Sequence, residues 1–215
     1  MKKGIFRDRR KLVTFNKRGL ILCEGYTEEN YFKGLLSQAK HRRKFASISV
    51  EIYKPKNNSP VGLVNKAKEE IKIAKHEKNP YNFIWVVFDK DGHAKISDAF
   101  EIARESNPEI KIAFTVPCFE FFVLLHFEKK TKPYKTCDEV ISQIKKQNYI
   151  VDYEKTANIF EILLPNMDNG LNNSEWIINQ FKDEIDNDKH LYDLPVYSNV
   201  HDLVNYLYSL IEEKE

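Results

Sequence analysis

Two acidic residues, Asp89 and Asp91, follow the unbroken apolar run FIWVVF of residues 83–88. Such a run is typical of a strand buried on both faces of a parallel sheet. If the extended conformation continues through Asp91, both carboxylates point to the same side of the strand. Their negative charges then repel each other, so either the pKa of one carboxyl is raised or the pair binds a cation. A hard divalent ion such as Mg²⁺ prefers these oxygen ligands. The alternative is an ordinary polar turn, because Asp-x-Asp-Gly is also common turn chemistry.

A second acid, Glu24, ends the shorter apolar run LILC of residues 20–23 and is followed by Gly25. An apolar stripe at helical spacing comes next, so we expect a helix with Thr27 as its N-cap and Glu28 in its first turn. The carboxyl ends of parallel strands meet at one edge of a sheet. We therefore expect Glu24 to lie beside the two aspartates, with Glu28 available for a second metal or as an outer partner.

A further acid, Glu120, lies inside a strongly apolar helix predicted over residues 119–127, which Pro117 precedes. Its position just past a fourth predicted strand favours a role at the same edge of the sheet. The alternative is a charge that complements the helix dipole at the N-terminus of that helix.

Positive charge is clustered, although the net charge of the chain is only +2. Lys90 and His93 flank the aspartates and are candidates to meet a scissile phosphate, or they are ordinary surface charges on a loop. Arg42, Arg43 and Lys44 form a second basic cluster, and the first eighteen residues and residues 129–132 hold more. This uneven distribution of positive charge is compatible with the binding of a polyanion at one end of the molecule. The alternative for any single cluster is an ordinary solvent-exposed surface.

Alternation of strands and helices predicts a parallel α/β core with right-handed crossovers. We expect strands at 20–23, 47–53, 83–88 and 109–115. We expect a helix capped by Ser59 with Pro60 at its first position, and another capped by Ser97. After Thr115 the pattern changes to helices near 136–144, 158–164, 174–185 and 199–211, with 149–151 as the only candidate strand.

The length of 215 residues, with 42% hydrophobic and 31% charged residues, is typical of one globular domain. Cys23, Cys118 and Cys137 are too few and too scattered to predict a disulfide framework or a zinc site. We expect Cys23 and Cys118 to be buried thiols, which suits a reducing, cytoplasmic location. No apolar run approaches the ~18 residues of a membrane span, and no signal peptide is recognisable, so we expect no membrane association.

The order of these residues resembles the Toprim domain of topoisomerases, bacterial primases and OLD-type nucleases. The resemblance rests on Glu24-Gly25 and Thr27-Glu28, followed by Asp89 and Asp91. The segments PCFE at 117–120, LLHF at 124–127 and VH at 200–201 make the chain more narrowly similar to the RloB family. That family consists of single-domain Toprim proteins associated with phage abortive infection and encoded beside an AAA-type ATPase.

The resemblance implies an α/β fold with a Toprim-like parallel sheet flanked by helices and a mainly helical C-terminal region. We predict a basic arm at 1–12, the Toprim-like core at 13–130 and a helical region packed on the core at 131–215. It also implies a nuclease that uses Mg²⁺ or Mn²⁺, cleaves RNA or DNA and is controlled by the ATPase. RNA, and tRNA in particular, is slightly favoured over DNA as the nucleic-acid partner.

The expected site residues fall into three groups. The catalytic group is Glu24, Asp89, Asp91 and Glu120; the metal ligands are Glu24, Asp89, Asp91 and Glu28; the nucleic-acid-binding group is Lys90, His93, Arg42, Arg43 and Lys44. The main alternative is a non-catalytic sensor or adaptor subunit that binds the ATPase. Nucleotidyl transfer is disfavoured because the chain is short and has no template-binding or zinc module. The chain has no Walker motif of its own.

Overall fold

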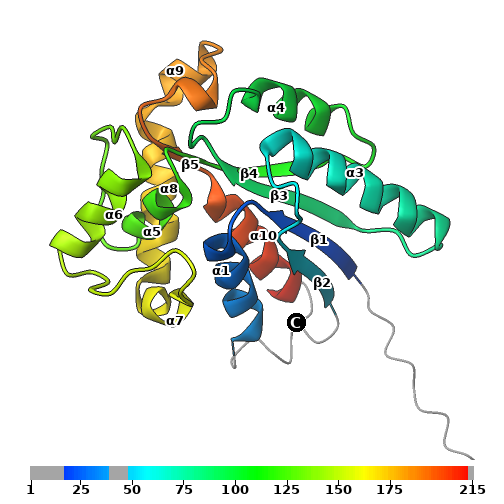
Figure 1. Ribbon diagram of the computed structural model, residues 1–215, viewed down its shortest axis with the longest axis horizontal. Coiled ribbons are helices and arrows are strands. Elements are labelled where there is room, and N and C mark those ends of the chain that lie inside the picture. Colours follow the sequence, from blue (N-terminus) through cyan, green and yellow to red (C-terminus); the bar gives the residue numbers. More distant parts are fainter. Residues whose placement is uncertain (1–16, 39–47, 213–215) are drawn as a thin grey trace, which may run out of the picture.

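A five-stranded sheet lies between layers of helices in the computed structural model, which describes residues 17–38 and 48–212 (Figure 1). The strand order is β2-β1-β3-β4-β5. The first four strands are parallel, and β5 is antiparallel to β4. The strands are β1 Lys17–Cys23, β2 Ile48–Tyr53, β3 Phe83–Asp89, β4 Lys111–Val116 and β5 Tyr197–Ser198.

The central strand β3 is buried along its whole length, as its apolar run predicts. Its side chains alternate between the two hydrophobic clusters that cover the faces of the sheet, with Trp85 and Val87 in one and Val86 and Phe88 in the other. The strand is flanked by β1 and β4, and β2 is an edge strand. The prediction of an α/β fold with a mostly parallel sheet and a helical end is confirmed.

Two pairs of helices cover the faces of the sheet. Helices α1 (Tyr26–Ser37) and α10 (Val200–Glu212) pack on one face, and α3 (Pro60–His76) and α4 (Ile96–Arg104) pack on the other. The predicted cap of α3 is confirmed, because the Ser59 hydroxyl accepts a hydrogen bond from the backbone N–H of Gly62. Helices α1, α3 and α4 are the crossover connections that keep the strands parallel and their carboxyl ends together, whereas α10 follows β5.

The remaining helices form a group beside the sheet, at the left of Figure 1. Thr136 caps one of them, because its hydroxyl accepts a hydrogen bond from the N–H of Glu139. Residues from this group, from α1 and from α10 share one hydrophobic cluster. The group comprises α5 Phe119–Leu125, α6 Cys137–Lys146, α7 Phe160–Leu163, η1 Leu164–Asn166, α8 Met167–Gln180, α9 Lys182–Asp186 and η2 Leu191–Asp193.

Several local predictions were wrong. Residues 149–151 form no strand, whereas β5 lies much later in the chain and pairs with the end of β4. Thr27 and Ser97 are not N-caps, because α1 begins at Tyr26 and α4 begins at Ile96, each one residue before the proposed cap. The helix predicted over 174–185 begins at Met167 and is interrupted at Phe181. The position of a two-residue strand and the first residue of a helix depend on tertiary contacts, which the pattern of neighbouring residues does not reveal.

The prediction that Cys118 is a free thiol was also wrong. Cys118 and Cys137, 19 residues apart in sequence, are joined by a disulfide. Cys118 immediately precedes α5, and Cys137 is the first residue of α6. The two helices therefore begin side by side, which the sequence distance did not reveal. Cys23 is free and buried, as expected.

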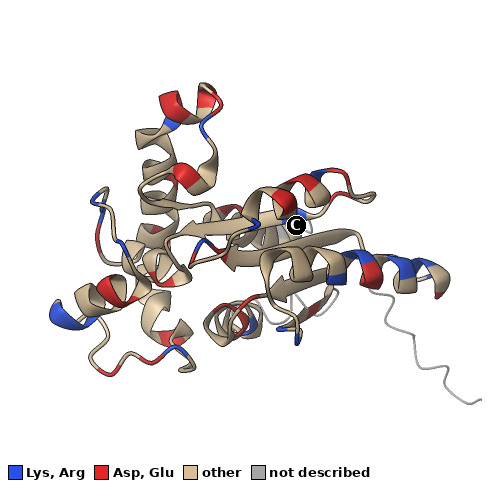
Figure 2. Cartoon of the chain, turned by 45° about the horizontal axis from the view of Figure 1, so that its top comes forward, with Lys and Arg blue, Asp and Glu red and all other residues tan. Residues whose placement is uncertain are grey.

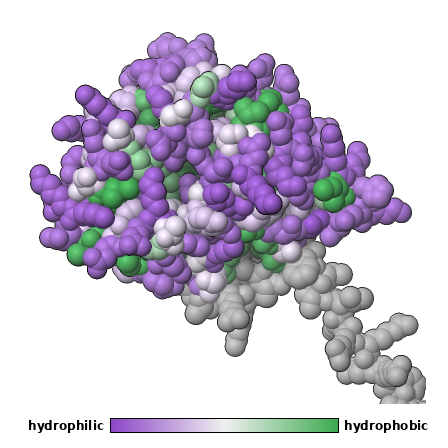
Figure 3. All heavy atoms as spheres, viewed as in Figure 1, coloured by the Kyte–Doolittle hydropathy of each residue, from purple (hydrophilic) through white to green (hydrophobic). Residues whose placement is uncertain are grey.

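Charged residues of both signs are spread over the outer faces of the helices (Figure 2), and the face seen in Figure 3 is mostly hydrophilic with small, scattered apolar groups. In the parts of the chain described here, no helix combines the length and the apolar character needed to cross a bilayer. The predicted basic arm at 1–12 and the cluster Arg42, Arg43 and Lys44 lie outside the described residues. The proposed division at residues 130–131 stays a prediction.

Candidate metal-binding cleft

The acids singled out in the sequence line one cleft of about 270 Å³ at the carboxyl edge of the parallel sheet. Glu24 follows β1, Asp89 is the last residue of β3, and Glu120 lies in the first turn of α5. The topology explains this meeting, because β1 and β3 are adjacent and parallel. The full lining is Glu24, Gly25, Tyr26, Thr27, Glu28, Lys54, Asn58, Asp89, Asp91, Glu120, Lys155 and Thr156.

Glu24 is held against the end of β3. Its Oε2 accepts a hydrogen bond of 3.2 Å from the backbone N–H of Asp89. Its Oε1 lies 2.7 Å from Nε2 of His93. The backbone on both sides is also fixed, because the Glu24 N–H donates to the Val87 carbonyl and the Glu24 carbonyl accepts from the side chain of Asn58. The carboxylate is thereby placed between the strand end and the histidine.

Asp89 lines the cleft and is buried, with 8% of its surface exposed. Its Oδ1 accepts from the N–H of Asp91 at 3.0 Å, and its Oδ2 accepts from the N–H of Phe119 at 3.2 Å. Burial raises the pKa of Asp89 well above its usual value, and the charges of Glu24, Glu28 and Glu120 raise it further. The bond from Phe119 opposes this shift without cancelling it.

Asp91 occupies a different environment from Asp89. The strand ends at Asp89, so the extended conformation does not continue and the shared-side argument from strand geometry does not apply. Asp91 is exposed in a turn in which Gly92 adopts a positive φ of 74°, a conformation that favours glycine. The stretch is therefore a polar turn whose two carboxylates line the cleft, and the binding of a cation there stays a prediction.

Glu28 approaches the same acids from α1 and is 4% exposed. Burial raises the pKa of its carboxyl to about 8; the charges of Glu120 and Glu24 act in the same direction, and the ammonium of Lys155 opposes them. The neighbouring Gly25 makes room for this side chain, because a Cβ at that position would lie 2.5 Å from Oε2 of Glu28.

Glu120 lines the cleft, but both of its oxygens are already in contact with other side chains. Oε1 accepts from the hydroxyl of Tyr153 at 2.7 Å, and Oε2 lies 2.9 Å from Sγ of Cys137. This acid is thus tied to the disulfide and to the segment before α7.

The cleft also holds cations that the sequence did not single out. Lys54 directly follows β2, so its place after a parallel strand was a usable signal. Lys155 lies 131 residues after Glu24 in a segment without regular structure, and no local pattern pointed to it. Of the predicted cations, His93 contacts Glu24, whereas Lys90 is half-buried and is not part of the cleft lining. Arg18, from the basic N-terminal stretch, is engaged with Glu51, Tyr81 and the Asn79 carbonyl.

The carboxylate oxygens of the cleft do not lie close enough together to surround a metal ion completely. Across residues 17–38 and 48–212, Cys118, Glu120 and Cys137 are the one set of three or more candidate ligands with atoms within 4.8 Å of one another. The two cysteines of that set are bonded to each other. Mg²⁺ commonly keeps several waters and uses only one or two carboxylates, so the wider set of Glu24, Asp89 and Asp91 fits it chemically.

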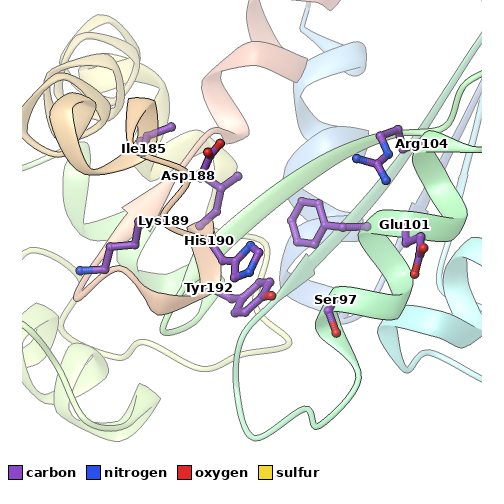
Figure 4. Close-up of a pocket in the computed structure, with 10 residues that line it drawn as sticks. Ser97, Glu101, Arg104, Ile185, Asp188, Lys189, His190 and Tyr192 are labelled. Atoms are coloured by element: carbon purple, nitrogen blue, oxygen red, sulfur yellow. The ribbon is translucent and has the colours of Figure 1, made fainter.

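A separate pocket of about 570 Å³ lies between α4 and the segment that runs from α9 to η2 (Figure 4). Its lining is largely apolar and aromatic, with Phe100, His190 and Tyr192 among its residues. None of the predicted site residues belongs to it. Pocket size therefore does not select the acidic cleft, which stands out by its chemistry.

Comparisons with known proteins give one match. A family model described as RloB-like protein matches residues 19–207, which include every residue of the cleft. Neither the search of curated proteins nor the search of solved structures found a match.

Proposed function

Because the chain belongs to the RloB-like protein family, we propose that it is a metal-dependent nuclease with its active site in the acidic cleft. The observation that carries this proposal is the gathering of five carboxylates, from Glu24, Glu28, Asp89, Asp91 and Glu120, in one cleft. Acids of like charge that are buried together destabilise the fold unless protons or cations compensate them. Such an arrangement is typical of functional sites.

Hard carboxylate oxygens are the ligands that Mg²⁺ and Mn²⁺ prefer, and Asp89, Asp91 and Glu24 are the proposed ligands. A bound magnesium ion would supply a nucleophilic water and stabilise charge at the scissile phosphate. Asp89 is oriented for this role by the N–H groups of Asp91 and Phe119, which fix both of its oxygens. Glu28 and Glu120 are proposed as outer acids or as ligands of a second ion.

Glu24 is the proposed general acid or base. Its Oε1 lies at hydrogen-bonding distance from Nε2 of His93, which can hold the carboxylate in place or exchange a proton with it. The proposal is also supported by the positions of Glu24 after β1 and of Asp89 and Asp91 after β3, which agree with the Toprim resemblance.

The substrate is proposed to be RNA or DNA, with tRNA as the favoured RNA. We further propose that an AAA-type ATPase controls the activity, as the family resemblance implies, and that the system defends against phage. An acidic site that damages cellular nucleic acid must be restrained before infection, so the isolated chain should have little activity.

The test compares wild type, Glu24→Gln and Asp89→Ala with Glu29→Gln, whose parent side chain is half-buried and pairs with the exposed Lys33. Binding of Mn²⁺ is measured by calorimetry, and cleavage of labelled RNA and DNA is measured with and without the ATPase. Asp89→Ala should lose metal binding, Glu24→Gln should lose cleavage, and Glu29→Gln should keep both. Absence of Mn²⁺ binding by the wild type would contradict the proposal. Partner binding without any metal-dependent cleavage would favour the adaptor alternative.

A further inference from the structure

One aromatic ring remains exposed at the acidic cleft. Tyr26 has 56% of its surface exposed, and it is the one Phe, Tyr or Trp side chain in the described residues that is not buried or half-buried. It lines the cleft and lies two residues after Glu24 in the sequence. The neighbouring aromatic residues Tyr31 and Phe32 of the same helix are fully buried. The exposed ring is therefore presented beside the carboxylates instead of being used in the core.

Two lysines, Lys54 and Lys155, line the cleft together with this ring. Nζ of Lys54 lies 5.3 Å from the centroid of the Tyr26 ring. Lys155 comes from a segment that is attached to α1, where the Thr27 hydroxyl donates to the Lys155 carbonyl and Asn30 donates to the Thr156 carbonyl. Neither Lys54 nor Lys155 forms an ion pair with a residue in the part of the chain that the structure describes. Both charges remain available to an anionic ligand.

An exposed ring that lines a cleft together with lysines and carboxylates has the chemistry of a nucleotide contact. A base can stack on an aromatic side chain only when one of its faces is free, which is the case in single strands, loops and ends but not inside a duplex. Ammonium groups beside the ring can contact the phosphates on either side of that base. The acids alone would repel the same phosphates.

We propose that Tyr26, Lys54 and Lys155 bind an unpaired nucleotide, so that the substrate of the cleft is a single-stranded or looped segment of nucleic acid. This inference rests on the proposed nuclease function and assigns the substrate class of the same site. The ring of Tyr26 stacks on the base, and the two lysines contact the flanking phosphates. The sugar–phosphate backbone next to that base then lies at Glu24 and Asp89.

The experiment uses the purified full chain with Ca²⁺ in place of Mg²⁺. Binding of a 2-aminopurine-labelled single-stranded oligonucleotide, as RNA and as DNA, is compared with binding of a blunt duplex. The variants are Tyr26→Phe, which keeps the ring, and Tyr26→Leu, which keeps an apolar side chain without a ring. Lys54→Ala and Lys155→Ala are matched by Lys72→Ala on the exposed side of α3. Because Tyr26 is exposed, these substitutions leave the core untouched, and thermal unfolding of each variant checks this.

We expect single strands to bind more tightly than the duplex, with quenched 2-aminopurine fluorescence. Tyr26→Leu should weaken single-strand binding by roughly 5- to 150-fold and remove the quenching, whereas Tyr26→Phe should behave as wild type. Lys54→Ala and Lys155→Ala should each lower the salt slope by about 0.7 per lost phosphate contact, and Lys72→Ala should not.

Three outcomes overturn the inference and are distinguishable from one another. If Tyr26→Leu binds single strands as the wild type does while the wild type still cleaves, the stacking contact is wrong and the nuclease function stands. If the wild type binds neither single strands nor duplex, both the inference and the proposed function fail. Loss of ATPase binding, but not of oligonucleotide binding, in Tyr26→Leu would instead place a protein partner on the ring and reject the nucleotide contact.

Discussion

Glu28 is buried among other acids, and this environment raises the pKa of its carboxyl to about 8 from a usual value of 4.5. The unfolded chain therefore releases this proton at a lower pH than the folded chain. Stability from the protonated group is fully present below about pH 4.5 and is lost as the pH rises through about 8. Near neutral pH, burial of this carboxyl therefore lowers the stability of the fold, whereas the proposed role at the metal site requires the carboxyl to be there.

We accordingly expect Glu28→Gln to be more stable than wild type at pH 8 without metal, by roughly 3–5 kcal/mol. The difference should shrink towards pH 4, where the wild-type carboxyl is protonated in both states. Urea unfolding at the two pH values measures it, with Glu29→Gln as the control on the same helix. Equal stability of Glu28→Gln and wild type at pH 8 would show that Glu28 is not the destabilising acid.

We propose that His93 positions Glu24, because its Nε2 lies 2.7 Å from Glu24 Oε1. Outer partners of this kind typically affect activity by about 10- to 100-fold. His93→Ala should lower kcat by this factor with little change in KM, and His93→Gln, which can still donate to Glu24, should restore part of it. Steady-state cleavage by the activated enzyme measures both constants, with His76→Gln on α3 as the control. A rise in KM alone would assign His93 to the substrate instead.

At the scale of elements, the disulfide between Cys118 and Cys137 joins the beginnings of α5 and α6. Closing a loop of this length restricts the unfolded chain and contributes about 3 kcal/mol. Reduction should lower the free energy of unfolding by about that amount, measured by urea unfolding with and without dithiothreitol. The variant with both Cys118→Ser and Cys137→Ser should be insensitive to the reductant. A wild-type transition that the reductant leaves unchanged would contradict the assigned role.

A second contact between elements attaches Lys155 to α1, since the buried Thr27 hydroxyl donates to the Lys155 carbonyl. Thr27→Val keeps the shape of the side chain and removes the donor. It should cost about 1 kcal/mol of stability and weaken oligonucleotide binding in the same direction as Lys155→Ala. Binding of Mn²⁺ by Thr27→Val should stay as in wild type. Unchanged oligonucleotide binding by Thr27→Val would show that this hydrogen bond does not position Lys155.

At the scale of the whole molecule, stability towards acid depends on the buried His126, which packs between helices α1, α5 and α8. Its ring lies against Tyr31 of α1 and Phe122 of α5, and a Cβ at Gly170 of α8 would lie 2.7 Å from it. Nδ1 lies 3.0 Å from the Phe122 carbonyl, so the ring is assigned the tautomer in which Nδ1 donates. Burial lowers the pKa of His126 to about 4.

The unfolded chain therefore binds this proton first as the pH falls from 6.5 towards 4. Stability should decrease over that range, by on the order of 3 kcal/mol from this group. His126→Asn should be less stable at pH 7 but should lose less stability between pH 7 and pH 4, and the exposed His190→Asn should retain the wild-type slope. Urea unfolding across this pH range gives the slopes. Parallel slopes for wild type and His126→Asn would contradict the assignment.

The sequence by itself determined the strands that carry the acids. The apolar runs before Glu24 and Asp89 are local signals, and the rule that parallel strands end at one edge was sufficient to place both acids together. The fold class followed from the same alternation of strands and helices. The structure shows that β1 and β3 are adjacent strands, which explains why Glu24 and Asp89, 65 positions apart in sequence, share a cleft.

Only the tertiary structure decided the features that join distant segments. Lys155 reaches the cleft because a segment 128 residues after Thr27 is tied to it, and Cys118 meets Cys137 because two helices begin side by side. The strand β5 exists because two residues near the end of the chain pair with β4. None of these depends on periodicity or on local preference. Each is set by the packing of elements, which a pattern of neighbouring residues does not encode.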